Sequence, residues 1–439
     1  MKAKFNLITE KAKRDKQLKF TALIHHINED NLVQCYSELK KDKASGIDGV
    51  TVEEYGRNLE WNVFQLVEKL KTKSYRPQPA RRVYIPKAGK KDEKRGLGIP
   101  TVEDKLVQLM LKKLLEAIFE TDFENSSHGF RPGRSCITAI KELDEEVMTR
   151  PINFIVEVDI RKFFDTVNHY WLLRCLEERV ADPNLLWLAR QFLIAGVVEE
   201  GEYHASDLGT PQGGVISPLF ANIYLHYVLD IWFEKVFKPT SKGHMKMIRY
   251  CDDFVVCCES EQDAKGFLKA LEERFSKFGL AISLEKTKII KFGRNTWQRC
   301  KKSKEKVATF NFLGFTHYCA ASRRGSFVIG HKTSKENLNR KLRGTKEWVK
   351  SVRNLFTLKT WWSVLKAKLT GHYNYFGISG NFRCLRQFYN QVISTVFKWI
   401  NRRSQRKSMT WEMYQQYLQR NPLPMPRICH ALYALAPTK

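Results

Sequence analysis

The stretch that decides the fold holds a pair of aspartates between two short apolar segments: Met247-Ile248-Arg249-Tyr250-Cys251-Asp252-Asp253-Phe254-Val255-Val256-Cys257-Cys258. Apolar runs of this length predict two strands, and the polar residues between them predict a tight turn. Aspartate is common in turns, so turn formation alone is one explanation for the pair. The alternative is a metal site, because two adjacent carboxylates beside buried strands repel each other unless a cation neutralises them.

A third carboxylate, Asp159, ends another apolar segment, residues 153–159. The elements that follow are a long apolar helix over 217–237, the aspartate hairpin, an amphipathic helix over 262–278 and a strand over 288–292. This order is typical of the split βαβ, ferredoxin-like plan, in which the strand that ends at Asp159 lies beside the hairpin. The three carboxylates would then meet at one end of the sheet. Carboxylate oxygens suit magnesium, and two such ions support in-line displacement at phosphorus.

The charge of the chain points to a polyanionic partner. Its formal net charge is +28 over 439 residues, and nucleic acid would relieve the self-repulsion, although a solvated basic surface is the alternative. Between His331 and Lys439 there are 21 Lys and Arg against 3 Glu and no Asp, which places +18 of the charge there. That stretch also holds 16 aromatic residues, which either stack on bases or pack in helix cores. Among them are Trp361, Trp362, Tyr373, Tyr375, Phe376 and Trp399.

The remaining patterns predict an α+β protein that ends in a helical part. Basic helices fill the first forty residues, a strand and a charged hairpin follow at 81–95, and helical apolar spacing covers 105–120. Beyond about Ser326 the pattern is wholly helical and basic. We therefore expect an N-terminal extension over 1–80, a central α+β domain over 81–325 and an all-α basic domain over 326–439.

Several classes of protein are not expected. The ten cysteines include no CxxC pair, which argues against zinc knuckles and against a disulfide framework. No stretch reaches the roughly 20 apolar residues of a membrane span, and no apolar segment follows the charged start of the chain. We therefore expect a soluble, cytoplasmic protein without a membrane partner.

Six blocks in a fixed order carry a family resemblance. The hairpin block Tyr250-Cys251-Asp252-Asp253 matches the YxDD signature of reverse transcriptases, with cysteine where alanine is usual. The other blocks are Ser45-Gly46-Ile47-Asp48-Gly49-Val50, His128-Gly129-Phe130-Arg131-Pro132-Gly133-Arg134-Ser135, Gly209-Thr210-Pro211-Gln212-Gly213-Gly214, Phe312-Leu313-Gly314-Phe315 and Gly371-His372-Tyr373-Asn374-Tyr375-Phe376. Together they resemble reverse transcriptases encoded by group II introns, over about nine tenths of the chain.

This resemblance implies a right-hand polymerase with fingers and a ferredoxin-like palm, followed by an all-α basic thumb and maturase domain. Asp159 and Asp252, with the backbone carbonyl of Ile160, would hold two magnesium ions, which manganese could replace. Asp253 would complete the catalytic triad. Asp165 fits a structural carboxylate better than a further metal ligand.

The resemblance also implies which residues meet the incoming deoxynucleotide. Lys87 and Arg95 would clamp the triphosphate from the fingers hairpin, although both could be ordinary exposed charges. Phe164 would be the steric gate against a 2′-hydroxyl, with core packing as the alternative for one member of the Phe163-Phe164 pair. Gln212 would lie near the base pair. Lys286 would protonate pyrophosphate, unless it is a solvated lysine.

Contacts with the primer or template are implied at Arg131, Gly213, Leu313 and Gly314. A cluster near the end of the chain is expected to bind RNA phosphates, the alternative being a solvated helix face. It consists of Arg402, Arg403, Arg406 and Lys407.

The expected function is an RNA-directed DNA polymerase that also binds its parent intron RNA as a maturase, to assist splicing and retrohoming. Its partners would be group II intron RNA, an RNA template with a DNA primer, and target DNA, with nucleoid association during integration. The alternative is an intron-independent relative that acts in DNA repair or phage defence. A splicing factor without polymerase activity and an RNA-synthesising polymerase fit less well, because the aspartates and Phe164 are present. Only Cys384 and Cys429 follow Cys319, so a zinc-bearing HNH nuclease and target-strand cleavage are not expected.

Overall fold

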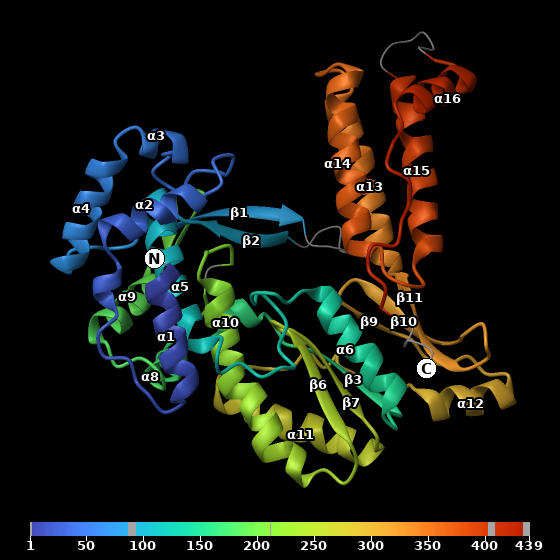
Figure 1. The fold of residues 1–439 in the computed structure, drawn as a ribbon, viewed down its shortest axis with the longest axis horizontal. Helices are drawn as coiled ribbons and strands as arrows, with labels where there is room; N and C mark the ends of the chain where they lie inside the picture. Colours follow the sequence, from blue (N-terminus) through green and yellow to red (C-terminus); the bar gives the residue numbers. More distant parts are fainter. Residues whose placement is uncertain (1, 87–93, 211, 403–408, 433–439) are drawn as a thin grey trace. The chain divides into compact units, whose positions relative to one another are not determined.

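The computed structural model describes residues 2–86, 94–210, 212–402 and 409–432 (Figure 1). Contacts divide the chain into two compact units. Among the described residues, the first unit comprises 2–86, 94–139, 156–210 and 212–289, and the second comprises 140–155, 290–402 and 409–432. None of the described helices combines the length and the apolar character that a membrane span needs.

A four-stranded sheet carries the aspartates. Its strands are β3 (Phe154–Asp159), β6 (Met245–Tyr250), β7 (Asp253–Cys258) and β8 (Lys288–Lys291), in the order β6-β7-β3-β8. The strand that ends at Asp159 therefore lies between the second hairpin strand and the last strand, which agrees with the split βαβ plan. The hairpin is antiparallel, with Tyr250 opposite Asp253.

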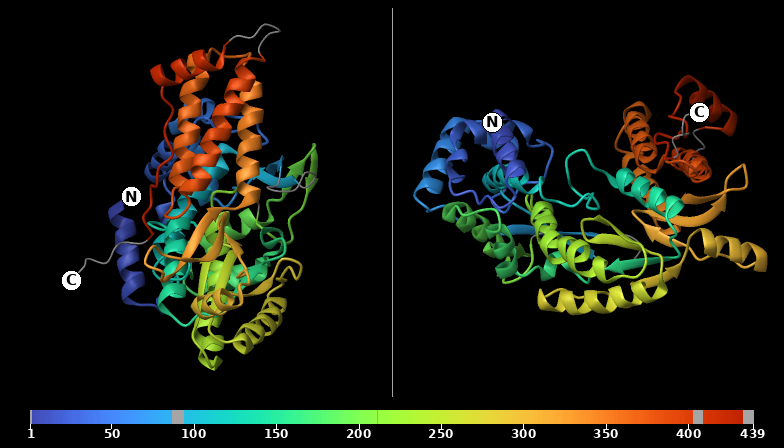
Figure 2. Two further views of the ribbon diagram at one scale, coloured as in Figure 1. Left: turned by 90° about the vertical axis from the view of Figure 1, so that its right-hand side faces the viewer. Right: turned by 60° about the horizontal axis from the view of Figure 1, so that its bottom comes forward.

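Helices cover this sheet because their apolar residues recur at helical spacing. Helix α11 (Glu261–Lys277) begins at Ser260, whose hydroxyl accepts from Gln262 and Asp263, and it buries residues at intervals of three and four. Figure 2 shows α11 running along one face of the sheet. The long helix expected over 217–237 is present as α10 (Ser217–Leu225), which continues into two π-helical segments, His226–Asp230 and Phe233–Phe237.

The rest of the first unit consists of helices around a second sheet. That sheet has the order β2-β1-β4-β5, with β1 (Ala80–Pro86), β2 (Lys94–Ile99), β4 (Val197–Glu199) and β5 (Glu202–His204). Its helices are α1 (Lys2–Arg14), α2 (Glu29–Glu38), α3 (Val52–Gly56), α4 (Leu59–Lys71), α5 (Val102–Phe119), α7 (Phe163–Thr166), α8 (His169–Glu177) and α9 (Pro183–Ile194). Helix α5 is the central one, and eleven of its residues are buried. Helix α6 (Cys136–Thr149) runs from the first unit into the second.

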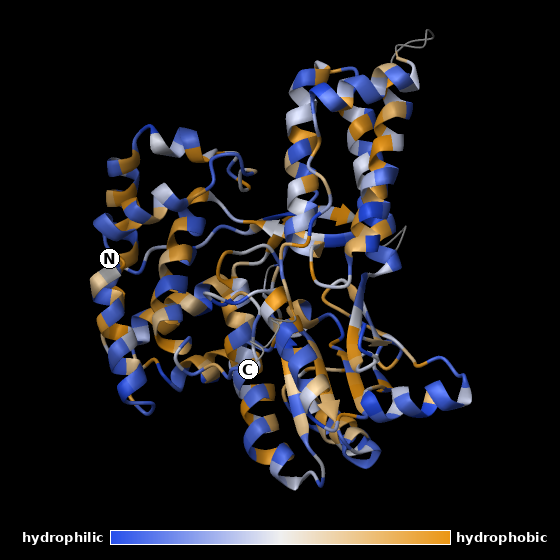
Figure 3. Ribbon diagram, turned by 45° about the vertical axis from the view of Figure 1, so that its right-hand side comes forward, coloured by the Kyte–Doolittle hydropathy of each residue, from blue (hydrophilic) through white to orange (hydrophobic). Residues whose placement is uncertain are grey.

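The second unit joins a small sheet to a helical bundle. The sheet has the order β11-β10-β9, with β9 (Phe310–Phe312), β10 (Phe315–Ala321) and β11 (Phe327–Thr333). The helices are α12 (Arg294–Ser303), α13 (Lys335–Val352), α14 (Leu358–Phe376), α15 (Phe382–Ile400) and α16 (Trp411–Arg420), and α13, α14 and α15 stand side by side in Figure 1. Figure 3 shows apolar residues along the bundle, whereas α12 is mostly hydrophilic.

One expectation about this region is wrong. The chain beyond Ser326 is not wholly helical, because Phe327–Thr333 forms β11 and pairs along its whole length with β10. Alternate residues Phe327, Ile329 and His331 are buried, which is the period of a strand. Contacts also group residues from Ile290 onward with the helices. A functional boundary at residue 326 stays a prediction.

Candidate active site

A cleft of about 920 Å³ in the first unit brings together seven of the residues predicted to act in catalysis, metal binding or nucleotide binding. Its walls include six basic side chains, from Arg82, Lys94, Arg95, Arg161, Lys162 and Lys286, and four aspartates, Asp159, Asp165, Asp207 and Asp252. A mainly basic cleft with carboxylates among its walls suits a ligand that carries phosphate groups and cations together.

The hairpin and β3 supply the predicted metal ligands. Asp159 is the last residue of β3, and Asp252 lies in the turn between β6 and β7, so both reach the cleft together with Ile160. Asp253 is the first residue of β7, is exposed and does not line the cleft. The structure therefore brings together two of the three predicted catalytic carboxylates.

The electrostatics of the pair favour a bound cation. Burial raises the pKa of Asp252, and the negative charge of Asp159 raises it further, whereas Arg95 opposes the rise. Asp159 already has a cationic neighbour, because the Lys286 ammonium lies 2.8 Å from its Oδ2. Lys286 lies in a turn that begins at Ser283. The Ser283 N–H donates to the Asp159 carbonyl, which holds this turn next to Asp159. Hard oxygen ligands that need positive charge fit a divalent cation.

A buried ionic network behind the turn fixes the position of Asp252. The Arg249 guanidinium is fully buried and pairs with Asp230 through two nitrogens, with 2.7 Å between Nε and Oδ1. Its Nη1 donates to the Cys251 carbonyl at 3.0 Å and to Asn222 Oδ1 at 3.1 Å. Cys251 has a φ of +58°, a left-handed conformation that a non-glycine residue keeps only when its surroundings hold it.

The neighbouring backbone closes around the same turn. Two backbone hydrogen bonds, each 2.8 Å long, join the segment before Gly129 to β6. The His128 N–H donates to the Arg249 carbonyl, and the Arg249 N–H donates to the Ser126 carbonyl. A Cβ on Gly129 would come within 2.4 Å of the Cys251 nitrogen, so only glycine allows this approach. The block His128-Gly129-Phe130 therefore braces the aspartate turn.

Both members of the Phe163-Phe164 pair line the cleft with Asp159 and Asp252. Phe163 is buried and Phe164 is half-buried, and the role of Phe164 as a steric gate stays a prediction. The two rings meet edge to face at 5.3 Å. The Thr210 N–H donates to the Phe164 carbonyl at 2.7 Å, which ties Phe164 to the Gly209–Gly214 block.

That block and the hairpin β1–β2 form the opposite wall. Gln212 lines the cleft, and its carbonyl accepts from Gly98 in β2 at 2.6 Å. Gly213 does not line the cleft: its φ is +110°, and a Cβ there would lie 2.7 Å from the Gly98 carbonyl oxygen. Its lack of a side chain is explained by this approach to β2. Arg95 lines the cleft, whereas Lys87 lies outside the described residues.

Comparison with known proteins agrees with this geometry. A family model described as reverse transcriptase (RNA-dependent DNA polymerase) matches residues 85–317, more than half of the chain and the part that forms the cleft. The chain belongs to the reverse transcriptase family. The group II intron-encoded protein LtrA of Lactococcus lactis is 34% identical over 286 residues, which cover 63% of this chain and 47% of LtrA. Protein YkfC of Escherichia coli is 33% identical over 278 residues, which cover 56% of this chain and 71% of YkfC.

More distant relatives include nuclear intron maturase 4 of Arabidopsis thaliana, 32% identical over 131 residues, which cover 29% of this chain and 16% of that protein. The chain spans about half the length of LtrA. The resemblance to group II intron-encoded proteins that the motifs indicated is thus confirmed.

Arg131 has a structural role in this reverse transcriptase that the sequence did not indicate. Its guanidinium is buried, pairs with Glu120 at 2.9 Å and donates to the carbonyls of Glu124 and Ser127, each at 2.6 Å. A direct contact with primer or template would require these bonds to break. The geometry therefore does not support that role for Arg131, and assigns it to holding the loop before the aspartate turn.

The remaining predicted residues lie in the second unit. Leu313 is buried with a φ of +49°, Gly314 follows with a φ of +83°, and the Tyr375 hydroxyl donates to the Leu313 carbonyl at 3.1 Å. These two residues form a tight turn between β9 and β10, and their contact with primer stays a prediction. Arg402 is exposed at the end of α15, whereas Arg403, Arg406 and Lys407 lie outside the described residues.

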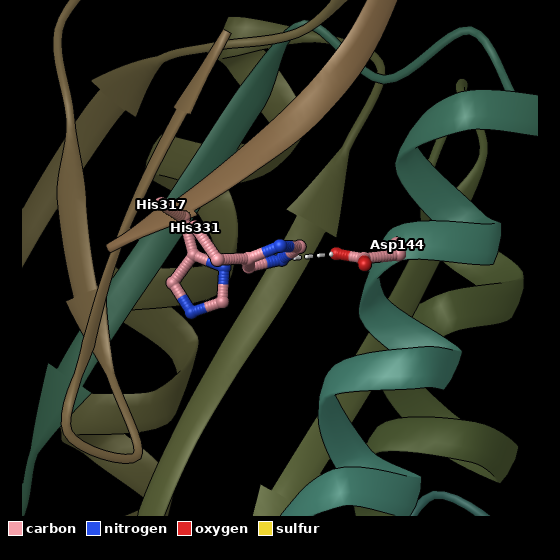
Figure 4. Close-up of side chains that lie close together, drawn as sticks. All are labelled: Asp144, His317 and His331. Atoms are coloured by element: carbon pink, nitrogen blue, oxygen red, sulfur yellow. Dashed lines mark hydrogen bonds and ion pairs between the residues drawn. The ribbon is translucent and has the colours of Figure 1, made fainter. Parts of the chain in front are cut away.

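The second unit also holds a buried group of Asp144, His317 and His331 (Figure 4). His331 Nε2 lies 2.9 Å from Asp144 Oδ1, and the His317 ring stacks on Phe310 with 4.8 Å between ring centres. Burial raises the pKa of Asp144 and lowers that of His317. The group contains none of the predicted ligands, and its contacts are those of a hydrogen-bonded core pair, so we do not assign the catalytic cation to it.

Three residues of the block Gly371–Phe376, namely His372, Tyr373 and Phe376, are buried in a core. His372 in α14 stacks on Phe388 of α15 with 3.7 Å between ring centres, and neither ring nitrogen has a hydrogen-bond partner. Burial lowers the pKa of His372 to about 4, so the folded ring is neutral at neutral pH. Of the aromatic residues considered for base stacking, Trp361, Trp362, Tyr373, Phe376 and Trp399 are buried, and Tyr375 is exposed.

We expect acid to destabilise the protein partly through His372. Its folded pKa is lowered, so between pH 6.5 and about 4 the unfolded state binds a proton that the folded state does not. Stability should therefore fall on acidification by roughly 1.4 kcal/mol per pH unit from this group. The difference between the thermal melting midpoints at pH 7 and pH 5 should be smaller for His372→Phe than for the wild type. An equal difference would show that His372 does not contribute.

Proposed function

We propose that the chain is an RNA-directed DNA polymerase whose active site is the cleft that contains Asp159 and Asp252. The observation that carries the proposal is the meeting of these two carboxylates with Arg95, Phe164 and Lys286 in one cleft of a reverse transcriptase-family fold. We assign the sheet β6-β7-β3-β8 to the palm, the hairpin β1–β2 with the N-terminal helices to the fingers, and helices α13–α15 to the thumb.

Each group in the cleft then has a part in nucleotide addition. Asp159, Asp252 and the Ile160 carbonyl would hold two Mg²⁺ ions, which supply Lewis-acid activation of the primer hydroxyl and of the leaving phosphate oxygen. Arg95 would bind the triphosphate by charge-assisted hydrogen bonds. Lys286 is paired with Asp159 and would donate a proton to the departing pyrophosphate once that pairing loosens. Asp253, exposed beside the turn, would complete the triad by supporting its charge balance.

The test is synthesis on a defined template. Purified protein, an RNA template annealed to a DNA primer, four deoxynucleotides and Mg²⁺ should give template-length product that DNase removes and RNase does not. Absence of product on RNA, with the protein folded and bound to the hybrid, would contradict the proposal.

We propose in addition that the protein binds group II intron RNA as a maturase. The support is its relatedness to LtrA, a group II intron-encoded protein, and to an intron maturase of Arabidopsis. RNA that co-purifies from native cells should be enriched in one structured intron. Enrichment of unrelated messages alone would favour the intron-independent alternative.

Phe164→Ala should relax the choice of sugar. Removing the ring that lines the cleft opens space for a 2′-hydroxyl, so ribonucleotide incorporation relative to deoxynucleotide should rise at least about tenfold, the equivalent of about 1.4 kcal/mol. DNA synthesis should fall only modestly. Single-nucleotide extension with each substrate measures the ratio, and Phe267→Leu, a change in a buried ring of α11 that does not line the cleft, is the control. Equal ratios in the two variants would place the gate elsewhere.

A further inference from the structure

Three cations surround a single tryptophan at the end of the helical bundle. Arg353 Cζ lies 4.5 Å from the centre of the Trp399 ring, Lys350 Nζ lies 5.1 Å from it and Arg402 Cζ lies 5.3 Å from it. Lys350 and Arg353 stand at the end of α13, and Trp399 and Arg402 at the end of α15. We call these four residues the Trp399 cation cluster.

No acidic group balances these charges. Within the described chain, no carboxylate lies within ion-pair distance of Lys350, Arg353 or Arg402, and Glu347, one turn before Lys350, pairs with none of them. Each of the three cations lies within 5.3 Å of one ring centre. This distance is shorter than the Debye length of about 8 Å at physiological salt. Their mutual repulsion is therefore little screened.

The helix ends explain only part of the arrangement. The C-terminus of a helix carries a partial charge of about −0.5, so the ends of α13 and α15 together offset roughly one of the three positive charges. Cation–π attraction to Trp399 helps to hold the side chains in place but brings no negative charge. An excess positive charge remains at this point.

Hydrogen-bond donors at the same place lack acceptors. Arg353 Nε and Nη1 and the Trp399 indole Nε1 are buried without a partner, and Trp399 is only 8% exposed. Buried donors are normally satisfied, and a group of orphan donors beside excess positive charge calls for an anionic acceptor. The Arg353 fork suits two oxygens of one phosphate. Lys350 and Arg402 are exposed, so rotation of these long side chains would open the way to the buried donors.

We propose that Lys350, Arg353 and Arg402, organised by Trp399, form a binding site for a phosphate group of an RNA backbone. The inference rests on the proposed function as a nucleic-acid enzyme and adds a specific contact at the end of the helical bundle. Trp399 itself does not stack on a base, because the protein and these cations cover its ring. The ring instead fixes the spacing of the three cations.

The test is the salt dependence of RNA binding. The triple variant Lys350→Gln/Arg353→Gln/Arg402→Gln should lower the slope of log affinity against log salt by roughly 0.7–0.9 units, the value for one lost phosphate contact. The matched control is Lys265→Gln/Lys269→Gln/Lys277→Gln on α11, which removes the same number of charges from another exposed helix. A slope in the triple variant equal to that of the control would overturn the proposal.

Further arms separate the possible reasons for failure. If the wild type itself neither binds RNA nor extends a primer on it, the proposed function fails; if it does both and the slopes agree, only this site fails. Should the triple variant unfold, Arg402→Gln, at an exposed position, should still weaken RNA binding and lower the slope by part of the roughly 0.7–0.9 units expected for the whole site. Inorganic phosphate alone, titrated into the protein without RNA at constant ionic strength, should give no saturable binding at the cluster. Saturable phosphate binding that the triple variant loses, with no difference in the RNA slope between wild type and triple variant, would show a site for free phosphate and overturn the RNA assignment.

Discussion

Asp252→Asn is expected to abolish primer extension, with a loss of at least about 10³-fold in rate. An amide cannot supply the negative charge that holds a divalent cation, and cation stabilisation of the transition state amounts to several kcal/mol, where each 1.4 kcal/mol is tenfold. Single-nucleotide extension under saturating primer–template measures the loss. Asp165→Asn, an exposed aspartate in the same cleft, is the matched control and should keep most of the activity.

The same substitution should not destabilise the protein. Burial and the negative charge of Asp159 raise the pKa of Asp252, so the ionised carboxylate is less favourable in the folded state than in the unfolded state. A carboxyl group whose pKa is higher in the folded state lowers the stability of the protein as pH rises through the pKa of the unfolded state. Asparagine does not ionise, so Asp252→Asn removes this loss of stability. Thermal melts without divalent ions should therefore show an unchanged or higher midpoint. Near-normal DNA synthesis by Asp252→Asn would refute the ligand assignment.

Arg249→Met is expected to damage both stability and catalysis. It leaves Asp230 as a buried, unpaired carboxylate, which costs about 3–5 kcal/mol of folding free energy. It also removes the donor that holds the Cys251 carbonyl at the left-handed position before Asp252. Loss of a group that orients a metal ligand typically costs about 10–100-fold in activity or metal affinity. Urea unfolding and extension rates at saturating substrate measure the two effects.

A second substitution separates the two effects. Asp230→Leu in the Arg249→Met background removes the stranded charge, so much of the lost stability should return. Activity should not return, because the Cys251 carbonyl still lacks its donor and the turn is free to move. If activity recovers together with stability, Arg249 acts on the fold alone and does not position Asp252.

The sequence predicted the parts of this site that depend on chain order. Apolar runs that end at Asp159 and flank Asp252 predicted the strands, and their order predicted the split βαβ arrangement that puts both aspartates in one cleft. The deeper burial of Phe163 relative to Phe164 could also be anticipated, since neighbouring side chains in a helical turn point in different directions.

Contacts between distant residues could not be predicted in the same way. In the sequence, Arg131 resembles any basic residue in an exposed loop. Only the tertiary structure shows that its guanidinium pairs with Glu120 and donates to backbone carbonyls. The Arg249–Asp230 pair did leave a signal that was missed. Each is a charged residue within an otherwise apolar element, and such a residue requires a partner when it is buried. The strand Phe327–Thr333 was missed because a short strand next to long helices gives little periodicity.

The most direct test is to measure, by calorimetry, how Mn²⁺ binds to the complex of the protein with primer and template. Asp159 and Asp252 are proposed to hold divalent cations together, so the wild type should bind Mn²⁺ in the cleft, and Asp159→Asn/Asp252→Asn should lose that binding while Asp165→Asn keeps it. The complex with RNA should still form, because the basic walls of the cleft are unchanged. Equal Mn²⁺ stoichiometry and affinity in the wild type and the double variant would contradict the account.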